Sequence, residues 1–290
     1  MTTTTKHSLL AMMAAMTMVA CSSDDVQEAV YTPAEGEIVL QIMHPGEQTR
    51  ATDTAFEATD SIGVYITAAD AALQVGGNEV NNEAFTYNGS SWTSARKVYW
   101  NNGTHNVYAY YPYSRQVDDT QEYSFCVQEN QDSQWGYSHS DFLWAGVTDV
   151  TASASPLKMQ FAHKLTNVVV RLEKGENFEG NLPTDAEVYL YSTVLKASIN
   201  LATGDASKNV YAGTGTIRCR KMANDEYRAI VVPQNITSRR PLVEVVTGGV
   251  SYLMEGKMSY KPGYRHTLTV TLDKNPEKVK IEIGGEIAGW

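Results

Sequence analysis

The chain has 290 residues, of which 33 are acidic and 23 are basic, so its formal net charge is −10. This acidic balance argues against nucleic acid and anionic membrane surfaces as partners, because both repel negative charge. Hydrophobic residues make up 42% of the sequence, which is enough for packed cores, and the length favours two domains.

The first twenty residues have the pattern of a signal peptide. Lys6 and His7 form a short basic region, and the apolar stretch at residues 8–20 is shorter than the ~20 residues that a membrane-spanning helix needs. Cys21 follows at once, before a polar and acidic run. The letters MVAC resemble the lipobox of bacterial lipoproteins, in which this cysteine carries lipid. The alternative is a plain signal peptide followed by an incidental cysteine.

We therefore predict a signal peptide at 1–20 and a flexible tether at 21–36, which is polar and poor in apolar residues. Lipid on Cys21 would anchor the chain to a membrane without spanning it. Arg50 is the only lysine or arginine between His7 and Ala95. Its Gly, Gln, Thr and Ala neighbours favour neither a helix nor a buried strand, so this position is open to a protease. A chance residue in an acidic surface segment is the alternative.

Beyond the tether, apolar residues alternate with period two, which predicts β-strands. The first strand is EIVLQIM at residues 37–43. The others are SIGVYI, NVYAYYPY, DFLWAG, NVVVRL, EVYLYS, YRAIVVP, PLVEVV, HTLTVTL and KVKIEI. In HTLTVTL, Leu268, Val270 and Leu272 share one face. No long amphipathic helix is expected, so the fold class is all-β, with two β-sandwiches.

Turn residues join these strands. Gly248-Gly249 predicts a tight hairpin between VEVVT and VSYLM, and Asn101-Asn102-Gly103 predicts another between KVYW and HNVYAYY. Small polar residues at 148–156 read as a linker. We place the domains at 37–152 and 153–290.

A search for catalytic chemistry finds none, and we predict that the chain is not an enzyme and uses no cofactor or metal. Ser138-His139-Ser140-Asp141 contains the letters of a triad, but neighbours on one strand point to opposite faces. His105 and His163 read as hydrogen-bonded residues rather than ligands. Cys219 alternates with two arginines, which predicts a buried, unreactive thiol.

The aromatic residues leave a binding function open. The sequence has 17 tyrosines and five tryptophans, and some of them, such as Trp100 and Tyr110, could stack on sugars. Alternation places Tyr108 and Tyr110 on one strand face and Tyr111 on the other, so core packing is the favoured reading. The alternative function is a monomeric surface lipoprotein that binds glycans through aromatic-rich loops.

The ordered set SIGVYI, VYW, VYAYYPY, SDFLWAG, LKMQFAHKLTNVVVRL, YRAIVVPQ and YKPGYRHTLTVTL resembles the fimbrillin (Mfa-like) superfamily of Bacteroidales. The resemblance runs from about residue 37 onward and includes the lipoprotein-type leader. It implies two tandem transthyretin-like β-sandwich domains, export as an outer-membrane lipoprotein, and assembly into type V pili that serve cell adhesion.

The resemblance also implies a role for Arg50. In the stalk subunits of the family an arginine-specific protease cuts behind the first strand, which is lost, and another subunit donates a strand to the groove. Here residues 37–43 match the removable strand, Arg50 matches the cut site, and Ala51 becomes the new N-terminus. Expected partners are other pilin subunits, the protease, and a host or bacterial surface ligand. The segment KVKIEIGGEIAGW is either a mobile donor or simply the last strand.

Overall fold

The computed structural model describes residues 35–48 and 55–290. Its helices are short: α1 (Gln134–Ser138) and the 3₁₀ turns η1 (Pro45–Gln48) and η2 (Pro276–Lys278). All other regular elements in the described part are strands, so the prediction of an all-β fold is confirmed. The division into two tandem transthyretin-like domains stays a prediction.

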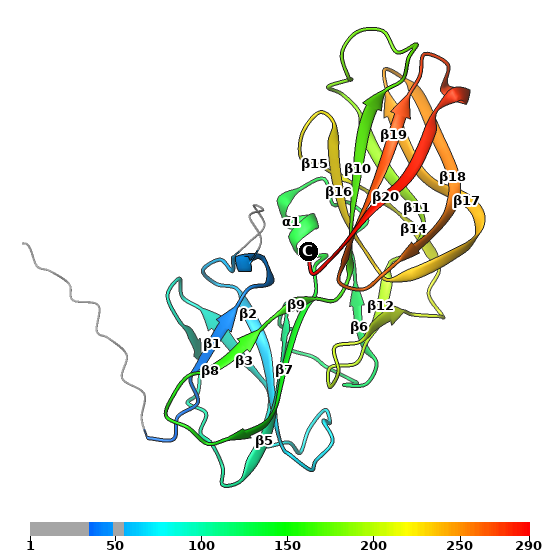
Figure 1. Ribbon diagram of the computed structural model, residues 1–290. Helices are drawn as coiled ribbons and strands as arrows, with labels where there is room; N and C mark the ends of the chain where they lie inside the picture. The colour runs from blue at the N-terminus through cyan, green and yellow to red at the C-terminus, as the bar shows by residue number, and fades with distance from the viewer. Residues whose placement is uncertain (1–34, 49–54) are drawn as a thin grey trace, which may run out of the picture. The chain divides into compact units, whose positions relative to one another are not determined.

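The largest sheet has six antiparallel strands in the order β4-β3-β2-β5-β7-β9 (Figure 1). Their bounds are β2 (Ser61–Ala68), β3 (Val80–Tyr87), β4 (Trp92–Ser94), β5 (Thr104–Tyr111), β7 (Leu143–Thr151) and β9 (Ala162–His163). β2 and β5 lie at its centre, where the predicted strands SIGVYI and NVYAYYPY fall.

Both faces of this sheet are buried at β2 and β5. Val107 and Ala109 pack on one side, while Tyr108 and Tyr110 pack on the other, as the alternation predicts. The approach of Tyr110 is so close that a Cβ on Gly63 would lie 2.3 Å from its ring. Glycine is therefore required at position 63.

A parallel pair of strands covers one face of the six-stranded sheet. β1 (Leu40–Met43) pairs with β8 (Leu157–Gln160) in register, Leu40 opposite Leu157 and Met43 opposite Gln160. The apolar residues between this pair and the sheet form what we call the front core. The front core comprises Ile38, Leu40, Ile62, Val64, Ile66, Val80, Phe85, Trp92, Val98, Val107, Ala109, Leu143, Ala145, Met159 and Phe161.

The later part of the chain forms two more large sheets, in the orders β15-β16-β10-β19-β20 and β14-β11-β17-β18. The first contains β10 (Thr166–Lys174), β15 (Arg220–Lys221), β16 (Glu226–Val231), β19 (Tyr264–Leu272) and β20 (Lys280–Ala288). The second contains β11 (Glu187–Val194), β14 (Thr214–Arg218), β17 (Gln234–Thr247) and β18 (Val250–Tyr260). A three-stranded sheet joins β6 (Tyr123–Cys126), β12 (Lys196–Ile199) and β13 (Ala206–Lys208).

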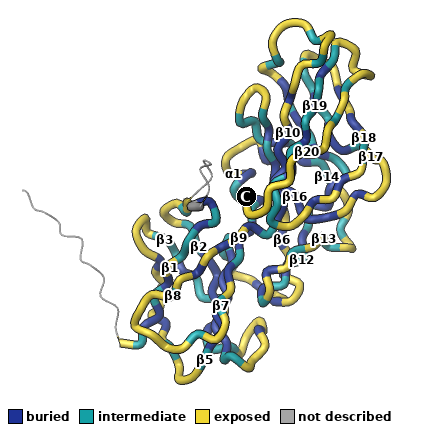
Figure 2. The backbone as a smooth tube through the Cα atoms, viewed as in Figure 1, coloured by how far each residue is buried: buried dark blue, intermediate teal, exposed yellow. Residues whose placement is uncertain are grey.

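A second apolar cluster, the main core, packs between these sheets and extends to the tyrosine face of the six-stranded sheet. It includes Tyr65 and Tyr110 as well as Val168, Leu268 and Val270. Buried residues follow the strands, and exposed ones follow most of the loops (Figure 2). The face of β19 predicted from HTLTVTL is fully buried.

Of the two predicted hairpins, one is confirmed. β17 and β18 pair across Gly248 and Gly249, which both have positive φ, 55° and 77°. The hairpin at Asn101-Asn102-Gly103 is wrong: β5 pairs with β2 and β7, while the segment before the turn bridges Glu37 through Tyr99. A local turn signal fixes a change of direction but not which strands then pair.

The division of the chain at 153 also stays a prediction. Three strand pairs cross it: β1 with β8, β7 with β9, and β6 with β12. The described residues, 35–48 and 55–290, belong to one compact unit. The polar stretch at 148–156 therefore interrupts the strand pattern without ending hydrogen bonding to the strands before it.

Candidate functional site

The predicted processing residues Cys21, Arg50 and Ala51 lie outside the described residues, as do the signal peptide and most of the tether. The predicted removable strand, residues 37–43, is described in full. This strand and the front core that it covers are therefore the candidate site.

Hydrogen bonds hold the strand on two sides, and different residues make them. On one side, Ile38 N–H donates to Val98 O at 2.8 Å, and Trp100 N–H donates to Gly36 O at 3.0 Å. On the other, Leu157 N–H donates to Val39 O at 2.8 Å and Phe161 N–H donates to Met43 O at 3.0 Å. The strand thus lies in a slot between β8 and the segment around Val98, and outside the six-stranded sheet.

Side chains of the strand close the front core. Ile38 and Leu40 are each 5% exposed, Ile42 is half-buried against the same cluster, and Gln41 between them is exposed. This alternation is what the sequence EIVLQIM predicts. Burying one Ile or Leu side chain stabilises a fold by ~1.5–3 kcal/mol, so the strand contributes substantially to the closure of this core.

Polar contacts fix both ends of the strand. Glu37 is buried, and its Oε2 lies 3.0 Å from Lys97 Nζ. At the other end, Gln160 Nε2 donates to the carbonyl oxygens of Met43 and His44, at 3.4 Å each. His44 Nδ1 accepts from Gly46 N–H at 3.0 Å. The strand is therefore held in one register.

The ring of His44 packs among aromatic side chains. Its centroid lies 4.9 Å from that of Phe56 and 6.0 Å from that of His163. Phe56 also contacts Trp92, Tyr111 and Phe161 edge-on. Sequence reasoning missed this cluster, because nothing in the spacing of the chain brings residues 44, 56 and 163 together.

The triad letters do not form a catalytic site. Ser138 is the last residue of the short helix α1, and residues 139–141 follow it, so none of the four lies on a strand. The argument that strand neighbours point to opposite faces was therefore the wrong reason to reject a triad. Ser140 Oγ donates to Gly136 O at 2.7 Å, and His139 Nδ1 lies 3.0 Å from Trp135 O. Asp141 faces His163 instead, with Oδ2 2.8 Å from Nδ1. No group of three or more metal-ligating side chains converges within the described ranges.

The remaining predicted residues behave as packing or hydrogen-bonding groups. His105 is fully buried, with Nδ1 2.9 Å from Glu79 Oε2 and Nε2 3.1 Å from Asn101 O. Cys219 is 2% exposed, and burial raises the pKa of its thiol far above the ordinary value. Both therefore match the roles that the sequence indicated.

Tyr110 cannot stack on a glycan. It is 1% exposed, and its hydroxyl donates to Asn82 Oδ1 at 2.8 Å. Trp100 is half-buried and packs on the ring of His105 at 5.2 Å. Tyr110 therefore cannot serve the glycan-binding alternative, because β5 lies at the centre of the sheet and both faces of β5 are buried.

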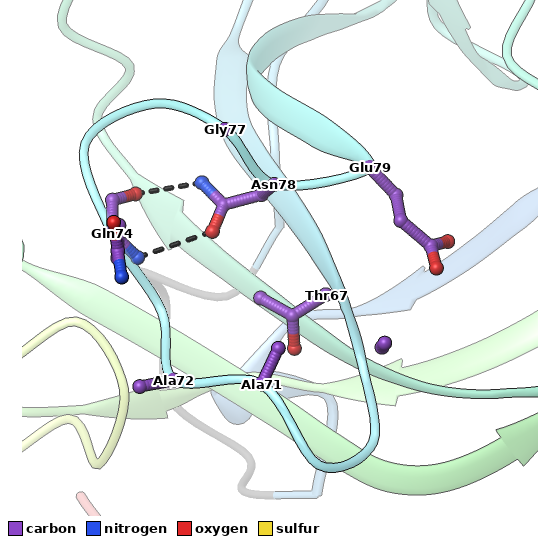
Figure 3. Close-up of a pocket in the computed structure, with 8 residues that line it drawn as sticks. Thr67, Ala71, Ala72, Gln74, Gly77, Asn78 and Glu79 are labelled. Carbon is purple, nitrogen blue, oxygen red and sulfur yellow. Dashed lines mark hydrogen bonds between the residues drawn. The ribbon is translucent and has the colours of Figure 1, made fainter.

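One surface cavity lies by the loop between β2 and β3. It has a volume of about 330 Å³ and is lined by Thr67, Ala71, Gln74, Asn78 and Glu79, among others (Figure 3). Asn78 and Gln74 bond to each other across the loop, at 2.7 and 3.1 Å, and Glu79 faces His105. Gln74, Asn78 and Glu79 thus have partners within the protein, whereas the buried Oγ1 of Thr67 has no hydrogen-bond partner.

These features define an all-β protein in which one short strand, seated in a slot, closes a separate apolar core. Among residues 35–48 and 55–290 no helix combines the length and apolar character needed to cross a bilayer. Residues 49–290 match the family described as fimbrillin-like, and the chain belongs to that family.

Two named relatives are similar to the chain. A Bacteroides uniformis protein named "Putative fimbrium subunit Fim1C" is 25% identical over 304 residues, which cover 97% of this chain and 94% of that protein. A Bacteroides ovatus protein named "Putative fimbrium tip subunit Fim1C" is 27% identical over 240 residues. That match covers 74% of this chain but 43% of the relative, so the chain spans less than half of its length.

Solved structures share the fold. A crystal structure of a Bacteroides ovatus protein, described as a "putative cell adhesion protein", superposes with a TM-score of 0.69 at 22% identity and covers 86% of this chain and 95% of that one. A Bacteroides uniformis protein with the same description gives a TM-score of 0.67 at 19% identity, covering 87% and 98%.

Proposed function

We propose that the protein is a fimbrial subunit that serves cell adhesion: a precursor lipidated at Cys21, cut after Arg50 by an arginine-specific protease, and assembled with other subunits by strand exchange at the cell surface. Membership of the fimbrillin-like family and the fimbrium names of its relatives support the role of subunit. A structural role in place of an enzymatic one is part of this proposal.

The proposal of strand exchange rests on how β1 is hydrogen-bonded and packed in its slot. Cleavage after Arg50 would separate residues 37–43 from the rest of the chain. Their departure would leave the inner faces of Ile62, Val64 and Met159 without cover, and would leave backbone groups of β8 and Val98 O without partners. A strand with apolar residues at alternate positions would satisfy both needs at once.

The slot sets the direction and the side-chain pattern of a strand that could replace β1. It must run parallel to β8 and present apolar side chains at the positions of Ile38, Leu40 and Ile42. The family match begins at residue 49, next to Arg50, so the matched region nearly coincides with the chain that cleavage would leave. This agreement supports processing at Arg50.

The test compares Arg50→Ala with Arg96→Ala in the native cell. Arg96 is exposed and pairs with Glu83, so its replacement controls for the loss of a surface arginine. We expect high-molecular-weight, SDS-resistant polymer from the parental and Arg96→Ala chains and only monomer from Arg50→Ala. Polymer of equal abundance from the Arg50→Ala chain would refute assembly through this cut.

Lipidation has its own readout. Cys21→Ala should abolish incorporation of labelled fatty acid and release the chain from the outer membrane, because the lipid is the proposed anchor. Unchanged membrane retention in that variant would contradict the anchor and leave the strand-exchange proposal standing.

A further inference from the structure

The strand β20 is an edge strand whose side chains are mostly exposed. It pairs with β19 on one side only, at the edge of its sheet. Its residues are almost all exposed, with Ile283 and Ile287 at 51% and 55%. Trp290, two residues beyond the strand, is 6% exposed. Val279 and Ile281 pack against the main core at the start of this segment, and after them Trp290 is the next residue that is not exposed.

Two glycines shape the backbone that leads to Trp290. At Gly285 φ is +53°, and the register between β19 and β20 shifts there, so the strand bends at a bulge. At Gly289 φ is +64°, and its N–H donates to Gly263 O at 2.9 Å. The positive φ angles explain the glycines at 285 and 289, since other residues adopt this conformation at a cost.

Trp290 stacks on the side chain of His163. The indole and imidazole rings stack with centroids 3.7 Å apart and an interplanar angle of 15°. His163 is 7% exposed and is fixed from its other side by Asp141, whose Oδ2 lies 2.8 Å from Nδ1. A carboxylate only accepts, so Nδ1 donates, and the ring that receives Trp290 cannot rotate freely.

His163 also touches the segment that carries β1. The ring of His44, directly after β1, meets it edge-on at 6.0 Å and 82°. One imidazole on β9 is thus flanked by residue 44 and by residue 290.

We propose that Trp290, His163 and Asp141 form a latch that holds β20 on the subunit, and that His44 couples this latch to β1, so that loss of β1 loosens β20. The latch is inferred from contacts in the uncut chain and does not depend on processing. The coupling to β1 matters for assembly only if β1 is removed, so the coupling rests on the proposed function. The consequence is that the outer edge of β19 becomes accessible after processing and stays covered before it.

Hydrogen exchange of the uncut, full-length chain tests the latch. Trp290→Ala should speed exchange of the β20 amides by about tenfold or more, while β16 in the same sheet stays protected. Ile287→Ala, on the same strand but exposed, is the matched control, and Trp290→Phe should restore most of the protection because an aromatic ring can still stack. Equal exchange in Trp290→Ala and Ile287→Ala would overturn the latch.

The coupling is tested by His44→Ala against Gln41→Ala, an exposed residue of β1. We expect faster β20 exchange only in His44→Ala. Adding Trp290→Ala should not give the sum of the two single effects, because both substitutions act through the ring of His163. Faster exchange confined to β1 and β8 would overturn the coupling and leave the latch intact. If the chain is never cut in cells, the proposed function fails while both exchange results are unchanged.

Discussion

His266 shows how one buried side chain sets a pH dependence. It is 1% exposed on β19, and its Nε2 accepts from Lys261 N–H at 3.2 Å, so the ring is held neutral. Burial lowers the pKa of His266 from its ordinary value of 6.5, against the opposing effect of Glu286 on β20. A proton added to Nε2 would break the bond to Lys261.

The sign of the effect follows from the lowered pKa of His266. Between that pKa and 6.5 the unfolded chain binds a proton that the folded chain does not, so the free energy of unfolding should fall as pH drops below about 6.5. The pKa of Glu286 is also lowered, through its hydrogen bond with Lys261, but its contribution is lost only below its ordinary value of 4.5. As pH falls, the loss of stability from His266 therefore begins before the loss from Glu286.

We expect His266→Phe to flatten the slope of stability against pH between 6.5 and the lower pKa of His266. Denaturant unfolding at several pH values measures it, with the exposed His139→Phe as control. An unchanged slope in His266→Phe would show that another group is responsible.

At the scale of elements, β1 closes the front core through a few side chains. Leu40→Ala should lower the free energy of unfolding of this region by ~2–4 kcal/mol, since it removes a 5%-exposed side chain from a packed cluster. Gln41→Ala, one residue on and exposed, should change it by less than ~0.5 kcal/mol. Exchange of the β8 amides gives the local measure. Equal effects of the two substitutions would mean that β1 does not seal the core.

At the scale of the whole described chain, two cores share one sheet. The front core and the main core lie on opposite faces of β2 and β5, through Val64 and Val107 on one side and Tyr65 and Tyr110 on the other. β1 contributes to the front core only. Its removal therefore uncovers one core and leaves the other packed.

Partial trypsin digestion of the folded chain tests this separation. A product cut at Arg50 should bind a hydrophobic dye and lose protection at β8, while β10 and β16 keep theirs, because their contacts lie in the main core. The Arg50→Ala chain under the same digestion is the control. Cooperative loss of protection in β10 and β16 would show that the cores are not independent.

The sequence by itself determined the fold class, the alternation of EIVLQIM and HTLTVTL, the buried thiol of Cys219 and the hairpin at Gly248-Gly249. Each depends on residues a few positions apart, whose geometry the backbone period and the turn chemistry dictate. The resemblance to the fimbrillin superfamily, now shown by the family match, also came from ordered local motifs.

Only the tertiary structure decided which segments meet. The parallel pairing of β1 with β8 joins residues more than a hundred positions apart, and the contacts of His163 with His44 and Trp290 join three distant parts of the chain. The segment before Asn101 bridges Glu37 instead of pairing with β5. Strand partners are chosen by the burial of whole faces and by the edges left open, and neither is encoded in a local pattern.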